Sequence, residues 1–405
     1  MSFFAVTARL EGRAGRAGVI TTPHGAIKTP AFVPVATAAA VKGATVEQMA
    51  ALGAQALLAN AYHLYLRPGP DVLAQAGGLG RFMGWRGPTF TDSGGFQVLS
   101  LGAGFKKVLA MDTAGLAERE VIARRSERMA RVDDDGVTFR SHIDGSSHRF
   151  TPEVSVGVQR QIGADVIFAF DECTTLMNSR AYQERSVART LAWAGRCLAE
   201  MARLERDTPA RQALYGVVQG AQHEDLRRQA ARDLVALEVD GRAFDGFGIG
   251  GALEKERLAE IVGWVTAELP PELPRHLLGI SEVDDLFAAV EAGADTFDCV
   301  APSRAARHGA IYSRDGRYNV KRAAFKRDFA PLEPGCDCPT CGSYTRAYVH
   351  HLLRAGELLG LTLATIHNER FTVRLVDAMR AAIEDGGAAA FDALRSAFLA
   401  RYFGA

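Results

Sequence analysis

Three aspartates, Asp92, Asp171 and Asp298, each stand at the end of a short apolar run of the chain. A single aspartate in such a place is often only the N-cap of the following helix. Three carboxylates at three strand ends can instead share a reaction. Two can divide the roles of nucleophile and acid or base, as in glycosyl transfer through a covalent sugar–carboxylate ester. The third can accept hydrogen bonds from N–H groups of a substrate. The residue types leave open which aspartate has which role.

Three cysteines crowd into six positions in the motif Cys336-x-Cys-x-x-Cys341, and His367 follows in Ala-Thr-Ile-His-Asn. Three thiolates and one imidazole form the closed tetrahedral shell typical of structural zinc. An iron–sulfur cluster normally requires a fourth cysteine, and a catalytic zinc requires an open position. Spacing does not decide between His367 and the neighbouring pair His350 and His351 as the fourth ligand.

The elements that must position these residues are short apolar runs that alternate with helical patterns such as 182–204 and 253–269. Near-continuous apolar strands separated by helices predict a parallel sheet covered on both faces. Most of the runs end in a polar residue or glycine, and such ends line one mouth of a (β/α)8 TIM barrel or a crevice of an open doubly wound sheet. No G-x-G-x-x-G motif supports the open sheet, so the α/β class with a TIM barrel is predicted. The runs are 56–60, 88–92, 165–171, 214–219, 244–250, 276–279 and 296–299.

The composition excludes several classes of protein. The chain has 405 residues, with 47 Lys and Arg against 47 Asp and Glu, and 48% of its residues are hydrophobic. A neutral chain with this much apolar material is neither a polybasic coat nor a disordered chain. Residues 1–18 carry no signal-peptide pattern, and the longest apolar stretch, 50–66, is too polar to span a bilayer. Cysteine spacing without a secretory signal indicates metal in a reducing compartment, so a cytoplasmic protein is expected.

Positive charge is concentrated in the segment 301–354, which holds ten Lys and Arg against four acidic residues and therefore carries +6. Four tyrosines are interleaved with these charges. A solvated loop region would explain the pattern, and so would a surface that contacts a phosphate backbone. The basic residues are Arg304, Arg307, Arg314, Arg317, Lys321, Arg322, Lys326, Arg327, Arg346 and Arg354.

Two segments depart from the alternation of strands and helices. Residues 102–135 combine a helical pattern of mixed charge with an acidic triplet at 133–135, which indicates a surface insertion. From residue 303 onward the chain changes to an arginine-rich loop, the cysteine cluster and helical patterns. The predicted organisation is a barrel core over 1–302, with the insertion at about 102–135. It is followed at 303–405 by an inserted zinc-binding subdomain and C-terminal helices that return to the barrel.

At this point the motifs resemble those of a known family, the bacterial tRNA-guanine transglycosylases (queuine tRNA-ribosyltransferases). The resemblance covers nearly the whole chain in the same order. The segments that carry it are Ala-Asn-Ala-Tyr-His-Leu-Tyr-Leu-Arg-Pro-Gly at 59–69, Thr-Asp-Ser-Gly-Gly-Phe-Gln at 91–97, Phe-Ala-Phe-Asp-Glu-Cys at 168–173, Phe-Asp-Cys-Val at 297–300, the cysteine motif, 343–352 and His-Asn at 367–368.

The resemblance implies a (β/α)8 barrel with an inserted zinc subdomain, in a homodimer without membrane contact. It implies exchange of guanine at wobble position 34 of tRNAs with GUN anticodons for a 7-deazaguanine, in queuosine biosynthesis. The flipped-out base would enter the barrel mouth, and the ribose would be held on an aspartate as a covalent ester. Because the incoming base replaces water, neither ATP nor a redox cofactor is required.

By motif, the resemblance assigns Asp298 as the nucleophile that attacks ribose C1′ and Asp92 as the general acid and base. One structural Zn2+ per subunit would be held by Cys336, Cys338, Cys341 and His367. The residues that would bind the base are Ser93, Gly94, Gly95, Phe96, Asp171, Cys173, Gln219, Gly250 and Gly251. The residues that would grip the anticodon loop are Gly279, Ile280, Ser281, Glu282, Val283, Asp284, Asp285, Ser303, Arg304, Ala305, Ala306 and Arg307.

Two features depart from the family pattern. The usual Gly-Gly-Leu-Ala-Val-Gly-Glu is here Gly-Gly-Ala-Leu-Glu-Lys-Glu at 250–256, so that Glu254 and Lys255 replace a small apolar residue and a glycine. This loop lies where the 7-substituent of the base would sit, and the choice between 7-aminomethyl-7-deazaguanine and queuine stays open. In addition, the insertion at 102–135 lengthens the distance in sequence between Asp92 and Asp171.

Three other functions compete with this interpretation. A metal-dependent barrel hydrolase needs a motif such as H-x-H at a strand end, and the chain has none. A non-catalytic tRNA-binding subunit would lack the nucleophile, whereas Asp298 and Asp92 are both present. A transglycosylase with another base or nucleic-acid specificity would differ around the cysteine cluster, which here resembles the wobble-position branch.

Overall fold

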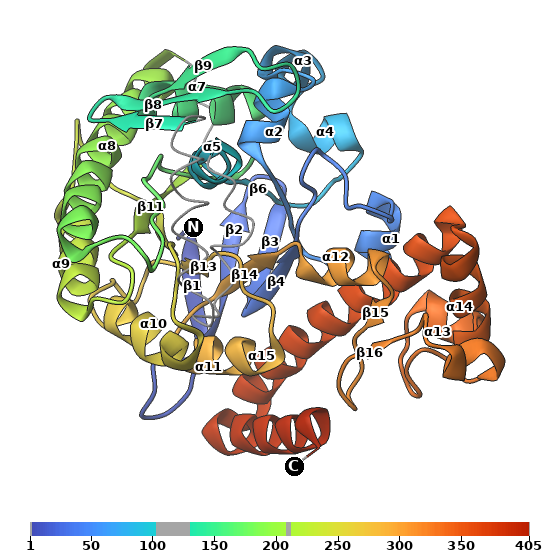
Figure 1. Cartoon of the computed structure of the whole chain (residues 1–405). Helices are drawn as coiled ribbons and strands as arrows, with labels where there is room; N and C mark the ends of the chain where they lie inside the picture. The colour runs from blue at the N-terminus through green and yellow to red at the C-terminus, as the bar shows by residue number, and fades with distance from the viewer. Residues whose placement is uncertain (1, 103–129, 208–211, 405) are drawn as a thin grey trace.

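Eight short parallel strands form the centre of the molecule, with helices arranged around them (Figure 1). The structure is a computed structural model that describes residues 2–102, 130–207 and 212–404. The strand order is β4-β14-β13-β12-β11-β10-β6-β5. The two end strands meet through a parallel bridge between Val35 and Leu58, where the amide of Ala36 donates to the carbonyl of Leu58 over 2.7 Å. The sheet is therefore a nearly closed barrel, as predicted. Its strands are β4 (Ala31–Pro34), β5 (Leu57–Ala59), β6 (Thr89–Thr91), β10 (Val166–Phe168), β11 (Ala213–Val218), β12 (Gly246–Ile249), β13 (Arg275–Leu277) and β14 (Thr296–Cys299).

The seven apolar runs of the sequence all contain barrel strands, but the eighth strand, β4, was missed. The first predicted run is 56–60, whereas the first barrel strand lies at Ala31–Pro34. This strand has only four residues and ends in proline, which has no N–H to donate to a ladder. It pairs with β14 from Ala31 to Pro34, next to Asp298.

The barrel interior is filled by large side chains such as Phe90, Phe168 and Tyr215. An antiparallel sheet of β1 (Phe4–Arg9), β2 (Arg16–Thr22) and β3 (Gly25–Thr29) contributes Phe4 and Ile20 to the same cluster. Because β3 leads directly into the start of β4, this sheet covers the amino-terminal end of the barrel. The carboxyl ends of the strands form the opposite mouth, where active sites of barrel enzymes are built.

The surrounding helices bury their apolar faces against the outside of the strands. The pattern at 182–204 lies within α8, whereas the pattern at 253–269 begins as a loop and a 3-10 turn before its helix starts at Leu258. The elements are α1 (Val46–Ala51), α2 (Ala61–Leu66), α3 (Pro70–Gln75), α4 (Leu79–Met83), α5 (Gly95–Gly102), α7 (Pro152–Ile162), α8 (Arg180–Asp207), α9 (Glu224–Ala236), η3 (Lys255–Arg257), α10 (Leu258–Thr266) and α11 (Val283–Glu291).

A second antiparallel sheet begins within the predicted insertion, at its C-terminal end. It consists of β7 (Ala130–Asp133), β8 (Gly136–Arg140) and β9 (Ser147–Phe150). Of the insertion at 102–135, residues 103–129 lie outside the described residues. The acidic triplet lies at the end of β7 and in its turn, where Asp134 is almost fully exposed and pairs with Arg189 on α8 at 3.1 Å.

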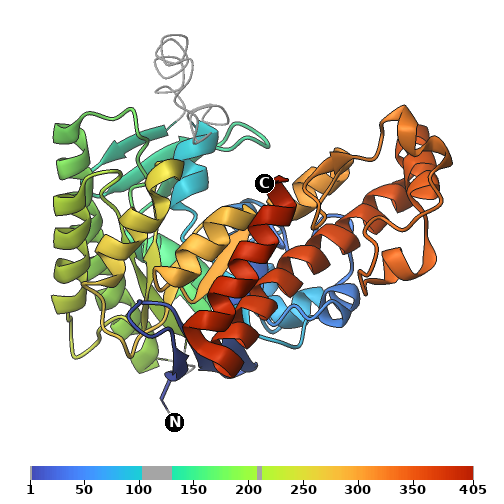
Figure 2. The same ribbon diagram turned by 90° about the horizontal axis from the view of Figure 1, so that it is seen from below.

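The chain after β14 forms a separate group of small elements and then a long helix that returns along the barrel (Figure 2). The long helix, α15 (Leu358–Phe403), is kinked at Gly387 and packs against β4, β1 and α12. Among the described residues, the helices are too short or too polar to cross a membrane. The small elements are α12 (Ala301–Arg307), β15 (Ala310–Ile311), β16 (Tyr318–Asn319), η4 (Ala323–Arg327), α13 (Pro339–Ser343) and α14 (Arg346–Ala355).

Candidate active site and metal centre

The carboxylate of Asp92 follows β6 and is held by the start of the neighbouring helix α2. The amide of Ala61 donates to Asp92 Oδ1 over 2.9 Å, and that of Gly94 over 3.2 Å. Asn60 caps α2 by accepting from the amide of His63, and its side-chain amide also donates to Asp92 Oδ2. Burial, and to a smaller extent the negative charge of Asp298, raises the pKa of Asp92 to about 7. At neutral pH this carboxyl can therefore both donate and accept a proton.

This raised pKa predicts how the stability of the fold depends on pH. Between about pH 4 and 7 the folded protein keeps a proton on Asp92 that the unfolded chain, with a carboxyl pKa near 3.8, has lost. The free energy of unfolding therefore falls as pH rises through this window. Asp92→Asn removes this slope. Between pH 4 and pH 8, the free energy of unfolding of the variant therefore rises relative to that of the wild type by up to about 4 kcal/mol.

Urea unfolding of both proteins at pH 4, 6 and 8 measures this difference. The substitution also changes the contact with Asn60, which shifts the free energy of unfolding by an amount that does not depend on pH. The prediction is therefore tested by how the difference between the two proteins changes with pH. A difference between the two proteins that stays constant over the whole range would contradict the prediction.

Asp298 lies at the carboxyl end of β14 and is only 14% exposed. Its Oδ1 accepts a hydrogen bond from the amide of Gly279 over 3.1 Å and lies 3.1 Å from Nε2 of His276. Asp298 and Asp92 both follow the carboxyl ends of parallel strands of the same barrel. The two carboxylates therefore belong to one mouth, on β6 and β14, which are separated in the barrel only by β4 and β5.

Asp171, the third aspartate, pairs with Gln219 at the same mouth. Gln219 Nε2 donates to Asp171 Oδ2 over 2.6 Å, and the Ser93 hydroxyl donates to Oδ1 over 3.1 Å. Burial raises the pKa of Asp171 to about 6, against the lowering effect of these two donors. The Oε1 of Gln219 is buried and has no partner among the described residues. Asp171 thus offers a hydrogen-bond acceptor next to the side-chain amide of Gln219. Hydrogen bonding to the edge of a guanine requires groups of both kinds.

Two glycines lie against Asp171 and Gln219, at positions where a Cβ atom would collide with these residues. A Cβ on Gly251, which has φ of 84°, would lie 2.5 Å from Gln219 Oε1, and one on Gly95 would lie 2.7 Å from the Asp171 carbonyl. Beneath Gly251 lies Arg227, which is fully buried and donates to the carbonyls of Val218, Ala221 and Gly250. The sequence analysis missed Arg227, because an arginine in a helix with many charges gives no signal of burial.

The remaining predicted base-binding residues surround this pair. Phe96 is 40% exposed at the start of α5, so that a ring face is accessible to a base. Cys173 is half-buried, and burial raises the pKa of its thiol to about 12, so the sulfur is protonated at neutral pH. Gly94 and Gly250 lie in the backbone of the two loops that carry Asp92 and Gly251.

The loop at 250–256 directs its two unusual charged side chains toward neighbouring helices. Glu254 pairs with Arg257 at 3.3 Å, and Lys255 pairs with Asp284 at 3.6 Å. Leu253, which directly precedes them, is buried. Lys255 therefore links the loop after β12 to α11, which follows β13.

The segments predicted to grip RNA lie directly after β13 and β14, at the same mouth. Within 279–285, Glu282 pairs with Arg317 at 2.9 Å. Within α12, Arg304 is exposed and Arg307 is half-buried. The remaining side chains contribute mainly to packing, because Ile280, Ser281, Val283, Asp285, Ser303 and Ala306 are buried.

Most of the positive charge in 301–354 is available to a ligand. Arg314, Arg317 and Arg346 pair with acidic side chains. The other seven take part in no ion pair within the part of the chain that the structure describes: Arg304, Arg307, Lys321, Arg322, Lys326, Arg327 and Arg354. Unpaired basic side chains fit both interpretations of the segment, a solvated loop region and a surface that contacts a phosphate backbone.

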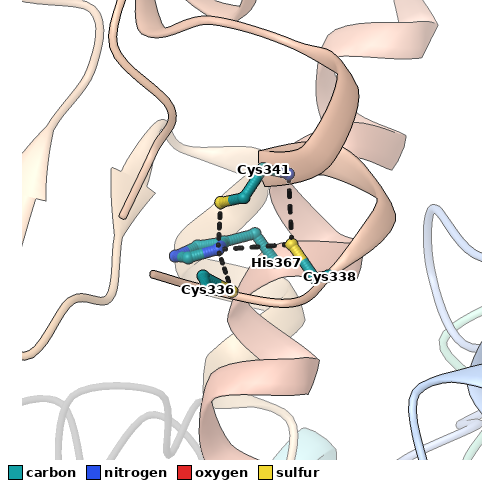
Figure 3. Close-up of side chains that lie close together, drawn as sticks. All are labelled: Cys336, Cys338, Cys341 and His367. Atoms are coloured by element: carbon teal, nitrogen blue, oxygen red, sulfur yellow. Dashed lines mark hydrogen bonds between the residues drawn. The ribbon is translucent and has the colours of Figure 1, made fainter. Parts of the chain in front are cut away.

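The three cysteines of the motif and His367 come together, with their ligand atoms all within 4.8 Å of one another (Figure 3). His367 Nδ1 lies 3.7, 3.6 and 3.3 Å from the sulfurs of Cys336, Cys338 and Cys341. His367 Nε2 lies 2.7 Å from the carbonyl of Tyr312 and is therefore the protonated nitrogen, which leaves Nδ1 free for a metal. This arrangement settles the choice of histidine.

The geometry fits a tetrahedral metal ion. Zinc bonds of about 2.3 Å to sulfur and about 2.0 Å to nitrogen separate sulfur from nitrogen by roughly 3.5 Å. The observed separations, from 3.3 to 3.7 Å, lie around this value. His350, the alternative ligand, is instead bonded to the carbonyl of Val320. The cluster can therefore bind a metal with a closed shell.

Comparisons with known proteins agree with this geometry. A family model described as "Queuine tRNA-ribosyltransferase" matches residues 11–403. A protein of that name from Symbiobacterium thermophilum is 45% identical over 392 residues, covering 96% of this chain and 88% of its own. One from Pelotomaculum thermopropionicum is 43% identical over 99% of both chains. One from Thermus thermophilus is 44% identical over 93% of this chain and 90% of its own.

Proposed function

The chain belongs to the queuine tRNA-ribosyltransferase family and is a tRNA-guanine transglycosylase of queuosine biosynthesis, and from this premise we propose that Asp298 and Asp92 carry out the exchange. The observation that carries the proposal is that the barrel brings both carboxylates to one mouth, at the carboxyl ends of β6 and β14, beside the Asp171–Gln219 pair. The natural target is proposed to be guanine at position 34 of tRNAs with GUN anticodons.

In the first step, an oxygen of Asp298 forms a bond to C1′ of the ribose while the bond from C1′ to N9 of guanine breaks. The electron pair of that bond leaves with guanine, and protonated Asp92 supplies the proton that neutralises the departing base. A pKa near 7 allows this proton transfer at neutral pH. The carboxylate of Asp298 also stabilises the positive charge that develops on the ribose.

In the second step, the incoming base gives its N9 proton to Asp92 and attacks C1′, and the ester bond to Asp298 breaks. Both carboxyls return to their starting states, so the exchange needs no oxidant and no energy-rich cofactor. The base is held by Asp171, Gln219 and the backbone of Gly251, with Phe96 stacking on its face.

The metal is proposed to be one structural Zn2+ per chain, held by the three cysteines and His367. Because the shell is closed, no coordination position is open to a substrate. The contribution of the metal is therefore to stabilise the fold of the residues that follow β14. We also propose that the chain forms a homodimer in the cytoplasm. The tRNA anticodon loop would bind across 279–285 and 303–307. The unpaired basic residues of 301–354 support the RNA part of this arrangement.

Incorporation of labelled bases into tRNA tests the function and the specificity together. Guanine and 7-aminomethyl-7-deazaguanine are expected to be incorporated, and queuine at least 10-fold more slowly. The reason is size: queuine has a larger 7-substituent than 7-aminomethyl-7-deazaguanine, and the loop at 250–256 is held in place by the Lys255–Asp284 and Glu254–Arg257 ion pairs. Side-by-side rates at equal base concentration measure this preference.

Two outcomes would contradict the proposal. Faster incorporation of queuine would reverse the specificity while leaving the reaction intact. Failure of all three bases to enter tRNA would favour a non-catalytic tRNA-binding subunit instead.

A further inference from the structure

The side chain of His276 on β13 is completely buried inside the barrel, directly beneath Asp298. Its ring is stacked on Phe90 at 5.6 Å between centroids and tilted against Phe168 at 5.2 Å. Both ring nitrogens have a polar partner: Nε2 lies 3.1 Å from Asp298 Oδ1, and Nδ1 lies 2.8 Å from Thr296 Oγ1. A buried histidine with both nitrogens engaged has one orientation, which it imposes on its partners.

We infer that His276 is a positioning residue that selects which oxygen of Asp298 attacks the ribose. The inference rests on the proposed role of Asp298 as nucleophile. His276 and the amide of Gly279 both bind Oδ1, whereas Oδ2 accepts no hydrogen bond from the described residues. Oδ1 is thus fixed and has its lone pairs engaged, and Oδ2 is the attacking oxygen.

Thr296 fixes the tautomer that this role needs. A carboxylate only accepts hydrogen bonds, so the ring must carry its hydrogen on Nε2. In the tautomer with its hydrogen on Nε2, Nδ1 is an acceptor, and the hydroxyl of Thr296 can donate to it. Thr296 pairs directly with His276 in the β13–β14 register and precedes Asp298 by two residues on the same face of β14. Strand β14 therefore carries both the proposed nucleophile, Asp298, and Thr296, which orients the ring of His276.

The same two donors act in the second step of the exchange. Once Oδ2 has bonded to C1′, Oδ1 is the carbonyl oxygen of the ester. When the incoming base displaces the ester, negative charge returns to the carboxylate, and the N–H groups of His276 and Gly279 are already directed at Oδ1. Donors placed before charge develops stabilise the transition state without reorganising.

Two amide substitutions separate this role from simple packing. In His276→Gln the side-chain amide reaches the place of Nε2 and can donate to Asp298, whereas in His276→Asn it reaches only the place of Nδ1. Single-turnover formation of the covalent tRNA adduct, followed by denaturing electrophoresis, is expected to slow about 100-fold in His276→Asn. His276→Gln is expected to recover most of this loss. The KM for tRNA should be unchanged in both, because neither substitution changes the mouth surface.

Thr296→Val provides a second variant that leaves the ring in place. It removes the hydroxyl that fixes the tautomer, so adduct formation is expected to slow about 10-fold or more, whereas Thr296→Ser should behave as wild type. Adduct formation at the wild-type rate in His276→Asn, or equal rates in the Gln and Asn variants, would overturn the inference. Absence of an adduct in the wild type would instead refute Asp298 as nucleophile, so the two failures are distinguishable.

Discussion

Asp298→Ala and Asp298→Asn are expected to lower guanine exchange by about 10⁴-fold or more, which is the scale seen when a covalent nucleophile is removed. Neither side chain can form the ester with C1′. Asparagine keeps the shape of the side chain and can still accept at Oδ1 from His276 and Gly279, so the mouth should stay folded. Exchange of labelled guanine into tRNA measures the rate, and denaturing electrophoresis shows whether the covalent adduct has disappeared.

Binding of tRNA to these variants is expected to change by less than a few-fold, because the basic surface of 301–354 is untouched. Asp165→Asn is a matched control. Asp165 is more deeply buried than Asp298 and lies at the other end of the barrel, where it accepts from the amide of Thr89 at the start of β6. That variant should lose stability but keep its exchange rate at a permissive temperature. Wild-type exchange in Asp298→Ala would refute the assignment.

Cys338→Ser is expected to release the metal from the cluster. Cys338 is buried, caps α13 and places its sulfur 3.6 Å from His367 Nδ1. A serine hydroxyl stays protonated at neutral pH and is a poor zinc ligand, so the closed shell loses a quarter of its donors. Metal analysis should find about one zinc per chain in the wild type and close to none in the variant.

The loss of metal is expected to reach the active site. Asn368, next to His367, accepts from the amide of Tyr312 and donates to the carbonyl of Pro302, just after Asp298. Proteolysis should therefore become faster within 310–356, and exchange should fall. Cys197→Ser, at a buried cysteine far from the cluster, should keep its zinc. Full zinc occupancy in Cys338→Ser would contradict the ligand set, and iron in the wild type would contradict the identity of the ion.

The positions of the three aspartates could be predicted because a strand end is a local property. An apolar run that stops at a carboxylate is visible in the sequence, and the barrel then brings such ends to one mouth. The fourth metal ligand could not be chosen by spacing, because His350, His351 and His367 all lie within reach along the chain. The choice depends on how α15 packs against Tyr312.

His276 and Arg227 were missed for a different reason. Both are polar residues buried in the interior, and their partners are distant in sequence: Asp298 for His276, and the carbonyl of Gly250 for Arg227. A histidine within a strand-like run carries no sign of which face it occupies until the neighbouring strands are known. The segments predicted to bind RNA illustrate the converse, because each predicted run of contiguous residues includes side chains that are buried and contribute to packing.

The long helix α15 has a consequence for the order in which this chain folds on the ribosome. Arg13, near the start, pairs with Asp392 across 379 positions, and Arg380 donates to the carbonyls of Lys28 and Pro30 beside β4. The first strands therefore obtain their cover from the last residues to be synthesised. A barrel of residues 1–302 alone would leave β4 and the first sheet without the cover of α15, so a chain cut at the predicted boundary of 302 is not expected to fold by itself. During translation the nascent barrel must wait, with its first strands unprotected, until the C-terminal helix leaves the exit tunnel.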